Sequence, residues 1–201
     1  MRPRSGRTRL HGVSLAALVI VLPLCWIPSF ASRIRAVNLE EMTDRAANIF
    51  SGRCVSVRVA HDSELDRPVT YVTFTVQRSV KGNARGTLTI KLLGEQEGSA
   101  EERRGIEGLP RFQRGEEVVL FLYGESRSGL TSPVGFGQGK FTLIKDKQGQ
   151  RLAVNGSGNA NLLRRLSPDA ERRLGLAASR WRGRRGIPPD ALLDMAVSLG
   201  E

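Results

Sequence analysis

Residues 117–154 read EVVLFLYGESRSGLTSPVGFGQGKFTLIKDKQGQRLAV. The apolar run VVLFLY at 118–123 is long enough for one fully buried β-strand and too short for a typical helix. Glycines and polar turns divide the remainder into shorter β-like segments, and the sequence DKQG predicts a hairpin turn before the last of them. These later predicted strands are 130–134, 139–144 and 151–154.

Three more strands are predicted upstream, at 54–59, 69–80 and 87–93. In the first, Val55, Val57 and Val59 alternate with small or polar residues, which is typical of a half-buried strand. The second is rich in β-branched and aromatic residues, which suit a pleated surface. Seven short strands separated by turn signals predict a small barrel or sandwich.

A short amphipathic helix is predicted at 38–50, before the first strand. Asn38 can cap its start, and Glu41 stands three residues further on, as in a capping box. We expect this helix to cover one mouth or side of the sheet. Its predicted apolar face consists of Leu39, Met42, Ala46, Ile49 and Phe50.

The N-terminus has the pattern of a secretory signal. Arginines at positions 2, 4, 7 and 9 precede an apolar stretch at 13–27, and the small residues Ser29 and Ala31 predict cleavage after Ala31. The alternative is an uncleaved membrane anchor, although the stretch is shorter than the ~20 residues of a spanning helix. We therefore expect a periplasmic or extracellular protein, with membrane association through this segment if it is not cleaved.

The sequence is predicted to have three parts. Residues 1–31 form the signal, 32–160 the β-domain with its preceding helix, and 161–201 a basic, partly helical tail. After cleavage Cys54 would be the only cysteine, so no internal disulfide is expected.

The tail contains the strongest candidate for a binding element. The chain carries a formal charge of +11, and four arginines in the predicted signal segment contribute +4 of it. A basic cluster around one aromatic residue follows the first predicted tail helix and comprises Arg180, Trp181, Arg182, Arg184 and Arg185. Arginines beside an indole can contact anionic phospholipid headgroups or nucleic-acid phosphates. Export argues against nucleic acid, and the alternative is a solvated linker between two small helices.

Catalytic and cofactor motifs are absent from the sequence. The segment Gly135–Lys140 lacks the first glycine and the hydroxyl residue of a phosphate-binding Walker loop, so its glycines are interpreted as a bulge or tight bend. Cys54 lies within a strand pattern, and no G-x-S-x-G motif occurs. We expect no catalytic residue, no cofactor and a non-enzymatic protein.

Two weaker site patterns are also present. His61 is followed by Asp62, Glu64 and Asp66, but these residues have neither zinc-site spacing nor the glycine and distal glutamate of an EF-hand. We therefore interpret His61 as a solvated loop residue and predict no metal site. The sequence Asn155-Gly156-Ser157 matches the glycosylation pattern, which often arises by chance.

From residue 49 to 154 the chain resembles a group of uncharacterised exported bacterial proteins. The segments that carry the likeness are 50–53, 71–74, 80–82, 115–122 and 137–141. They look like a small OB-type barrel, similar in shape to the netrin-like domain of tissue inhibitors of metalloproteinases. The resemblance covers about half of the chain and implies an OB-type barrel. Together with the strand and helix patterns above, it predicts a mainly β fold: a small OB-like closed or partly open antiparallel barrel of about seven strands, with a short N-terminal helix and a helical C-terminal tail.

Inhibitors of that family dock an N-terminal cysteine onto the protease metal. The predicted mature chain begins with Ser32 instead, and Cys54 lies far inside it, so no inhibitory site is carried over.

Three functions remain open at this stage. The first is an exported, non-enzymatic binding domain that presents the Gly-, Glu- and Arg-rich loop 94–116 and one barrel rim to a protein or envelope polymer. The second is an envelope protein whose Arg/Trp tail binds anionic membrane surface. The third is a netrin-like inhibitor module.

Overall fold

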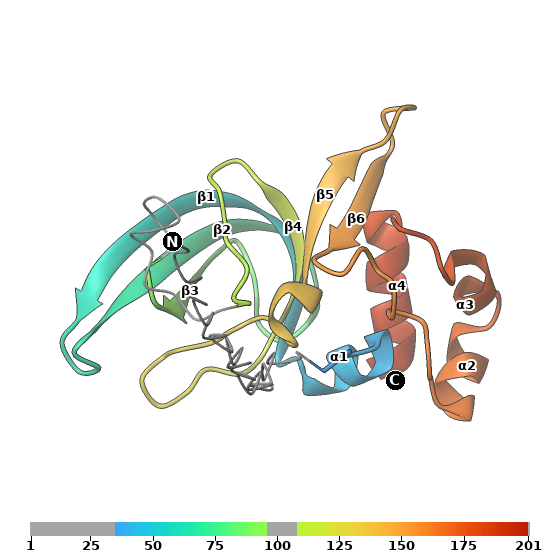
Figure 1. Ribbon diagram of the computed structural model, residues 1–201, viewed down its shortest axis with the longest axis horizontal. Helices are drawn as coiled ribbons and strands as arrows, with labels where there is room; N and C mark the ends of the chain where they lie inside the picture. Colours follow the sequence, from blue (N-terminus) through green and yellow to red (C-terminus); the bar gives the residue numbers. More distant parts are fainter. Residues whose placement is uncertain (1–34, 96–107, 201) are drawn as a thin grey trace, which may run out of the picture. The chain divides into compact units, whose positions relative to one another are not determined.

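The computed structural model describes residues 35–95 and 108–200 and is mainly β, as predicted (Figure 1). One antiparallel sheet has the strand order β3-β2-β1-β4-β5-β6. Its strands are β1 (Asn48–Asp62), β2 (Arg67–Lys81), β3 (Thr87–Leu93), β4 (Glu117–Leu122), β5 (Lys140–Lys145) and β6 (Arg151–Asn155). The helices are α1 (Leu39–Arg45), the 3-10 helix η1 (Phe136–Gln138), α2 (Pro168–Leu174), α3 (Leu176–Trp181) and α4 (Pro189–Gly200).

Strand β4 is buried on both of its faces, which confirms the fully buried strand predicted for this run. Val118, Leu120 and Leu122 point into one hydrophobic cluster, whereas Val119 and Phe121 point into another. Successive side chains of a strand face opposite sides, so a continuous apolar run places one set in each cluster.

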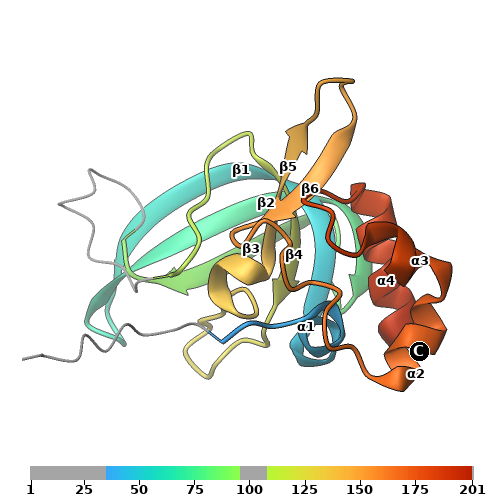
Figure 2. The ribbon, with the colours of Figure 1, turned by 45° about the vertical axis from the view of Figure 1, so that its right-hand side comes forward.

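The first cluster, here the inner core, lies within the curved part of the sheet. Phe74 is in edge-to-face contact with Phe50 and Phe112, with ring centroids 5.7 and 5.4 Å apart. Cys54 and Ile90 are also buried in this cluster. Figures 1 and 2 show the long strands β1 and β2 curving strongly around this region.

The second cluster, here the helical core, lies between the other face of the sheet and the helices. The ring of Phe121 packs against that of Phe141, with 5.7 Å between the ring centroids. Helix α4 adds several buried apolar side chains. Arg78 of β2 adds ion pairs to Asp190 at 3.4 Å and Asp194 at 2.6 Å on α4. Residues 161–200 therefore share a core with the sheet, and the described residues 35–95 and 108–200 belong to one compact unit.

Strand β1 departs from the predicted alternation at a β-bulge. Val55 has no partner on β2, because Cys54 pairs with Phe74 and Ser56 with Thr73. The extra residue reverses the pattern, so Cys54 is fully buried while Val55 is 36% exposed. Bulges of this kind increase the bend and twist of long strands.

The predictions of about seven strands and of a closed barrel are wrong for the described chain. The sheet has six strands and remains open between β3 and β6. The segment 130–134 forms only isolated bridges, from Leu130 to Lys91 and from Pro133 to Leu122. Proline has no amide hydrogen to donate, which limits strand pairing at that position.

The helix predicted at 38–50 is also shorter in the structure. It ends at Arg45, and Ala46 is extended with φ −72° and ψ 132°. Ile49 and Phe50 lie instead in β1, where they enter the helical and inner cores respectively. Strand geometry allows these neighbours to face opposite cores, which one face of a helix does not.

No helix within residues 35–95 and 108–200 is long and apolar enough to cross a membrane. The predicted signal at 1–31 and most of the loop predicted at 94–116 lie outside the described residues.

The double burial of β4 predicts that its two faces stabilise the same folded unit. Leu120→Ala and Phe121→Ala should each lower the free energy of unfolding by about 2–5 kcal/mol, because each leaves a cavity in a different core. Urea denaturation followed by circular dichroism would measure this. As a control, Leu176→Ala removes a side chain that is 87% exposed and should change stability by less than about 0.5 kcal/mol. Full stability in either β4 variant would contradict the two-core description.

Candidate functional site

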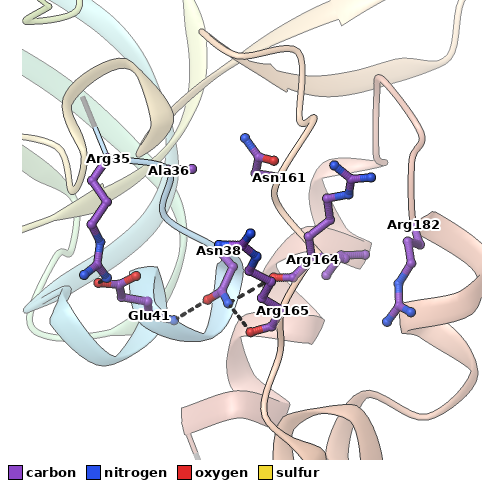
Figure 3. A pocket seen from close by; sticks show the side chains of 9 residues that line it. Arg35, Ala36, Asn38, Glu41, Asn161, Arg164, Arg165 and Arg182 are labelled. Atoms are coloured by element: carbon purple, nitrogen blue, oxygen red, sulfur yellow. Dashed lines mark hydrogen bonds and ion pairs between the residues drawn. The ribbon is translucent and has the colours of Figure 1, made fainter. Parts of the chain in front are cut away.

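A groove of about 960 Å³, here called the arginine groove, is large enough to hold a ligand. It is bounded by the segment before α1, the turns before α2 and the residue that follows α3 (Figure 3). Four arginines and one glutamate line it, which gives a formal excess of three positive charges. Its lining residues are Arg35, Ala36, Asn38, Glu41, Asn161, Leu163, Arg164, Arg165 and Arg182.

The one carboxylate of the groove is already neutralised. Glu41 pairs with Arg35 and, at 2.6 Å, with Arg45 one turn further along α1. The hydrogen bond from Arg35 holds the pKa of Glu41 below its ordinary value, so this carboxylate stays ionised at neutral pH. Arg182 likewise pairs with Glu171 of α2.

Arg164 and Arg165 differ from the other two arginines. Their side chains are exposed and make no ion pair with any residue that the structure describes. Their backbone carbonyls, by contrast, are held firmly, because the Asn38 amide nitrogen Nδ2 donates to both, at 3.1 and 2.9 Å. The wall of the groove is thus fixed through the backbone, and its two guanidinium groups remain available.

Asn38 also caps α1, as the sequence predicted. Its Oδ1 accepts a hydrogen bond from the backbone N–H of Glu41 at 2.9 Å. The carboxylate of Glu41 turns towards its two arginine partners. The Asn38 side chain therefore fixes both the start of α1 and the position of the turn at Arg164 and Arg165.

Gln138 holds the opposite side of the groove from a buried position. Its Oε1 accepts from the N–H of Val37, and its Nε2 donates to the carbonyl of Arg35, both at 2.9 Å. The segment Gly135–Lys140 thus forms a tight bend around η1, and Gly135 has the left-handed φ of 64°. Its glycines allow a close packing contact, and Gln138 aligns the chain that carries Arg35.

A second buried amide orders the chain between β6 and the groove. The Asn155 Oδ1 accepts from the N–H groups of Ser157 and Asn159, at 3.1 and 2.8 Å, and its Nδ2 donates to the carbonyl of Gln138 at 3.0 Å. Asn155 is 7% exposed. The glycosylation pattern at this position therefore presents no accessible acceptor amide in the folded chain.

The basic cluster predicted from the sequence lies beside the groove. Arg180, Arg184 and Arg185 are exposed and form no ion pair within the part of the chain that the structure describes. The Arg180 guanidinium carbon lies 4.9 Å from the centre of the Trp181 ring, and Trp181 itself packs partly against the helical core. Only Arg182 of the cluster lines the groove.

The predicted loop histidine makes one local contact. His61 Nε2 lies 3.2 Å from Asp66 Oδ1 at the exposed β1–β2 turn. Asp62 is occupied by an ion pair to Lys91 and by the N–H groups of Glu64 and Leu65, which lower the pKa of its carboxyl group. No cluster of three or more His, Cys, Asp or Glu residues that could hold a metal occurs among residues 35–95 and 108–200.

Cys54 is fully buried in the inner core and forms no disulfide. Burial, assisted by the negative charge of Glu116, raises the pKa of its thiol. The protonated form therefore dominates at neutral pH, and this form is a poor nucleophile.

The end of the loop predicted at 94–116 is anchored to the sheet. Phe112 is 5% exposed within the inner core, and Lys140 Nζ lies 4.6 Å from the centre of its ring. Lys140 also pairs with Glu116 at 2.7 Å and donates to the carbonyl of Arg111.

No family model matches the chain, and no curated protein matches it.

Sequence patterns alone did not predict the arginine groove. Arg35, Arg164 and Arg165 are far apart in the chain or lie outside the obvious basic cluster. Gln138 lies in the segment Gly135–Lys140, which the sequence allowed us to interpret from its glycines alone, so no role was predicted for Gln138. The one signal for the groove was the cap at Asn38, whose second contact depends on a turn more than 120 residues away.

Asn38 provides a test of how the groove is built. Asn38→Ala removes both the helix cap and the tether to the turn, so it should lower the free energy of unfolding by about 2 kcal/mol. Asn38→Ser keeps a capping oxygen but has no amide to donate across the groove, and it should lose roughly half as much. Urea denaturation of the two variants would measure the difference. Equal stabilities of Asn38→Ser and wild type would show that the tether contributes nothing.

Proposed function

We propose that this chain is an exported, non-enzymatic binding domain that contacts anionic membrane surface through its basic cluster. The observation that carries the proposal is the state of Arg180, Arg184 and Arg185. All three are exposed without an acidic partner in the described chain, although the helices around them pack into the helical core. The basic cluster thus lies on helices that are packed against the rest of the domain.

An exposed leucine adds an apolar element to the same surface. Leu176 begins α3 and is 87% exposed, and Arg180 follows it by four residues on the same helix. Residues four apart share a helix face, so an apolar side chain and a guanidinium lie side by side. This combination suits the boundary between lipid headgroups and acyl chains.

Electrostatics sets the expected strength of this contact. An arginine near an anionic membrane surface contributes about 1 kcal/mol, and this contribution falls off within a Debye length. Three arginines with one leucine therefore support reversible, salt-sensitive association.

The proposal of export rests on the sequence of residues 1–31, and that of a non-enzymatic role rests on missing motifs. The burial of the Cys54 thiol agrees with the second point, because a buried, protonated thiol is poorly suited to nucleophilic chemistry.

We also propose that the curved part of the sheet is related to OB-type barrels, including the netrin-like domain. The strong curvature of β1 and β2 around one inner core supports this kinship. A netrin-like inhibitory role has less support, since Cys54 lies in the interior of β1 and is fully buried.

A second candidate function is binding of a protein or envelope polymer through loop 94–116 and the adjoining rim. The anchored end of the loop favours it, because Phe112 fixes where the segment rejoins the sheet. This candidate would use other residues than the basic cluster.

Membrane binding is tested with the chain from residue 32, because the apolar segment at 13–27 could insert by itself. Arg180→Gln, Arg184→Gln and Arg185→Gln together should weaken co-sedimentation with phosphatidylglycerol-containing vesicles by about tenfold or more. Added salt should also weaken vesicle binding by the wild-type protein.

A variant with the same net charge serves as the matched control. Arg67→Gln, Arg85→Gln and Arg127→Gln remove three exposed arginines elsewhere and should leave most vesicle binding intact. Equal losses in the two triple variants would reduce the effect to net charge and refute a specific surface. If the wild-type protein bound pure phosphatidylcholine vesicles as strongly as phosphatidylglycerol-containing vesicles, this result would also refute a surface specific for anionic lipid.

The second candidate predicts a different outcome. Replacing 96–107 with a short Gly-Ser linker keeps the Phe112 anchor and removes most of the loop. Affinity capture from envelope extract should then lose the partners recovered with the unaltered chain, whereas the basic-cluster variant should retain them. An unchanged set of partners without the loop would exclude this candidate.

A further inference from the structure

The arginine groove holds more positive charge than the fold uses. Glu41 is neutralised by Arg35 and Arg45, and Arg182 is paired with Glu171. Arg164 and Arg165 are the two groove arginines left without an acidic partner in the described chain. Their exposed side chains contribute positive potential to the groove and no ion pair to stability.

The turn that carries these two arginines is held in an unfavourable backbone conformation. Arg165 has φ 53°, in the left-handed region that a glycine or asparagine adopts more readily. The Asn38 hydrogen bonds to the carbonyls of Arg164 and Arg165 hold the turn in place. Residues held in strained backbone conformations cluster at functional sites.

The four guanidinium groups come from three segments and are spread around the groove (Figure 3). They do not converge on one point, as they would around a single small anion. A groove of about 960 Å³ falls at the upper end of the range for small-molecule sites, roughly 300–1,000 Å³. The arrangement therefore suits a ligand with several anionic groups.

We infer that the arginine groove is a binding site for a ligand that carries two or more phosphate groups. Guanidinium groups bind phosphate oxygens through paired, charge-assisted hydrogen bonds, and each phosphate supplies up to two negative charges against the excess of three in the groove. Arg164 and Arg165 are the main contacts, and Arg35 and Arg182 contribute charge from the two sides. This site is separate from the membrane contact of Arg180, Arg184 and Arg185.

The probe for this site is inorganic tripolyphosphate, titrated into the full chain in nonionic detergent and followed by calorimetry. We expect saturable binding that weakens with salt. Arg164→Gln with Arg165→Gln should weaken it about tenfold or more, because both unpaired guanidinium groups are lost. The matched control, Arg67→Gln with Arg85→Gln, removes the same charge elsewhere and should stay within about twofold of wild type.

Further variants separate a binding role from a structural one. Arg164→Lys with Arg165→Lys keeps the charge but not the fork of donors, so its affinity should be intermediate. Arg165→Gly relaxes the left-handed backbone, so its melting temperature should not fall although tripolyphosphate binding weakens. Loss of binding that is accompanied by a lower melting temperature in every variant would overturn the inference.

Two sources of phosphate are distinguished by competition. If mixed micelles containing phosphatidylglycerol displace tripolyphosphate from the groove, the phosphates belong to clustered lipid headgroups. If they do not, the ligand is a soluble or polymeric phosphate compound.

Other outcomes would overturn the site. These are no saturable binding by the wild-type chain, or the same affinity in the Arg164→Gln/Arg165→Gln variant as in its control. The variant with Arg180→Gln, Arg184→Gln and Arg185→Gln tests independence, and it should bind tripolyphosphate normally. Failure of membrane binding would leave this result unchanged.

Discussion

The structure depends on one strand that is buried on both faces. The alternating side chains of β4 fill the inner core through Leu120 and its neighbours and the helical core through Phe121. A strand with only one apolar face would leave either the curved sheet or the C-terminal helices without a packing partner. Because β4 serves both, α4 and its preceding helices become part of the same folded unit as the sheet.

Within this unit, side-chain amides assemble the arginine groove. Asn38, Gln138 and Asn155 each bond to backbone groups of distant segments, and each lies at the end of a helix or strand, where such groups lack regular partners. The amide carries both donors and acceptors, so one residue can join two segments. These neutral contacts hold the backbone of Arg35, Arg164 and Arg165, and the guanidinium groups of Arg164 and Arg165 keep their charge for a ligand.

The basic residues of the helical side fall into two groups. Arg173 and Arg182 are paired with acids on neighbouring turns and helices, which restricts their contribution to binding. Arg180, Arg184 and Arg185 of the basic cluster, and Arg164 and Arg165 of the groove, are instead unpaired within the described chain. Positive charge without internal partners is what an anionic surface or ligand can neutralise, whereas paired charge costs desolvation without a matching gain.

The sequence by itself determined the mainly β class, the buried strand at 118–123, the cap at Asn38 and the exposed basic cluster. Each of these depends on neighbours within a few residues, so periodicity and local hydrogen bonding suffice. Only the tertiary structure decided the strand count, the bulge at Val55 and the packing of the tail. It alone also brought Arg35 together with Arg164 and Arg165, because contacts across more than 120 residues arise from the packing of both cores and leave no periodic pattern in the chain.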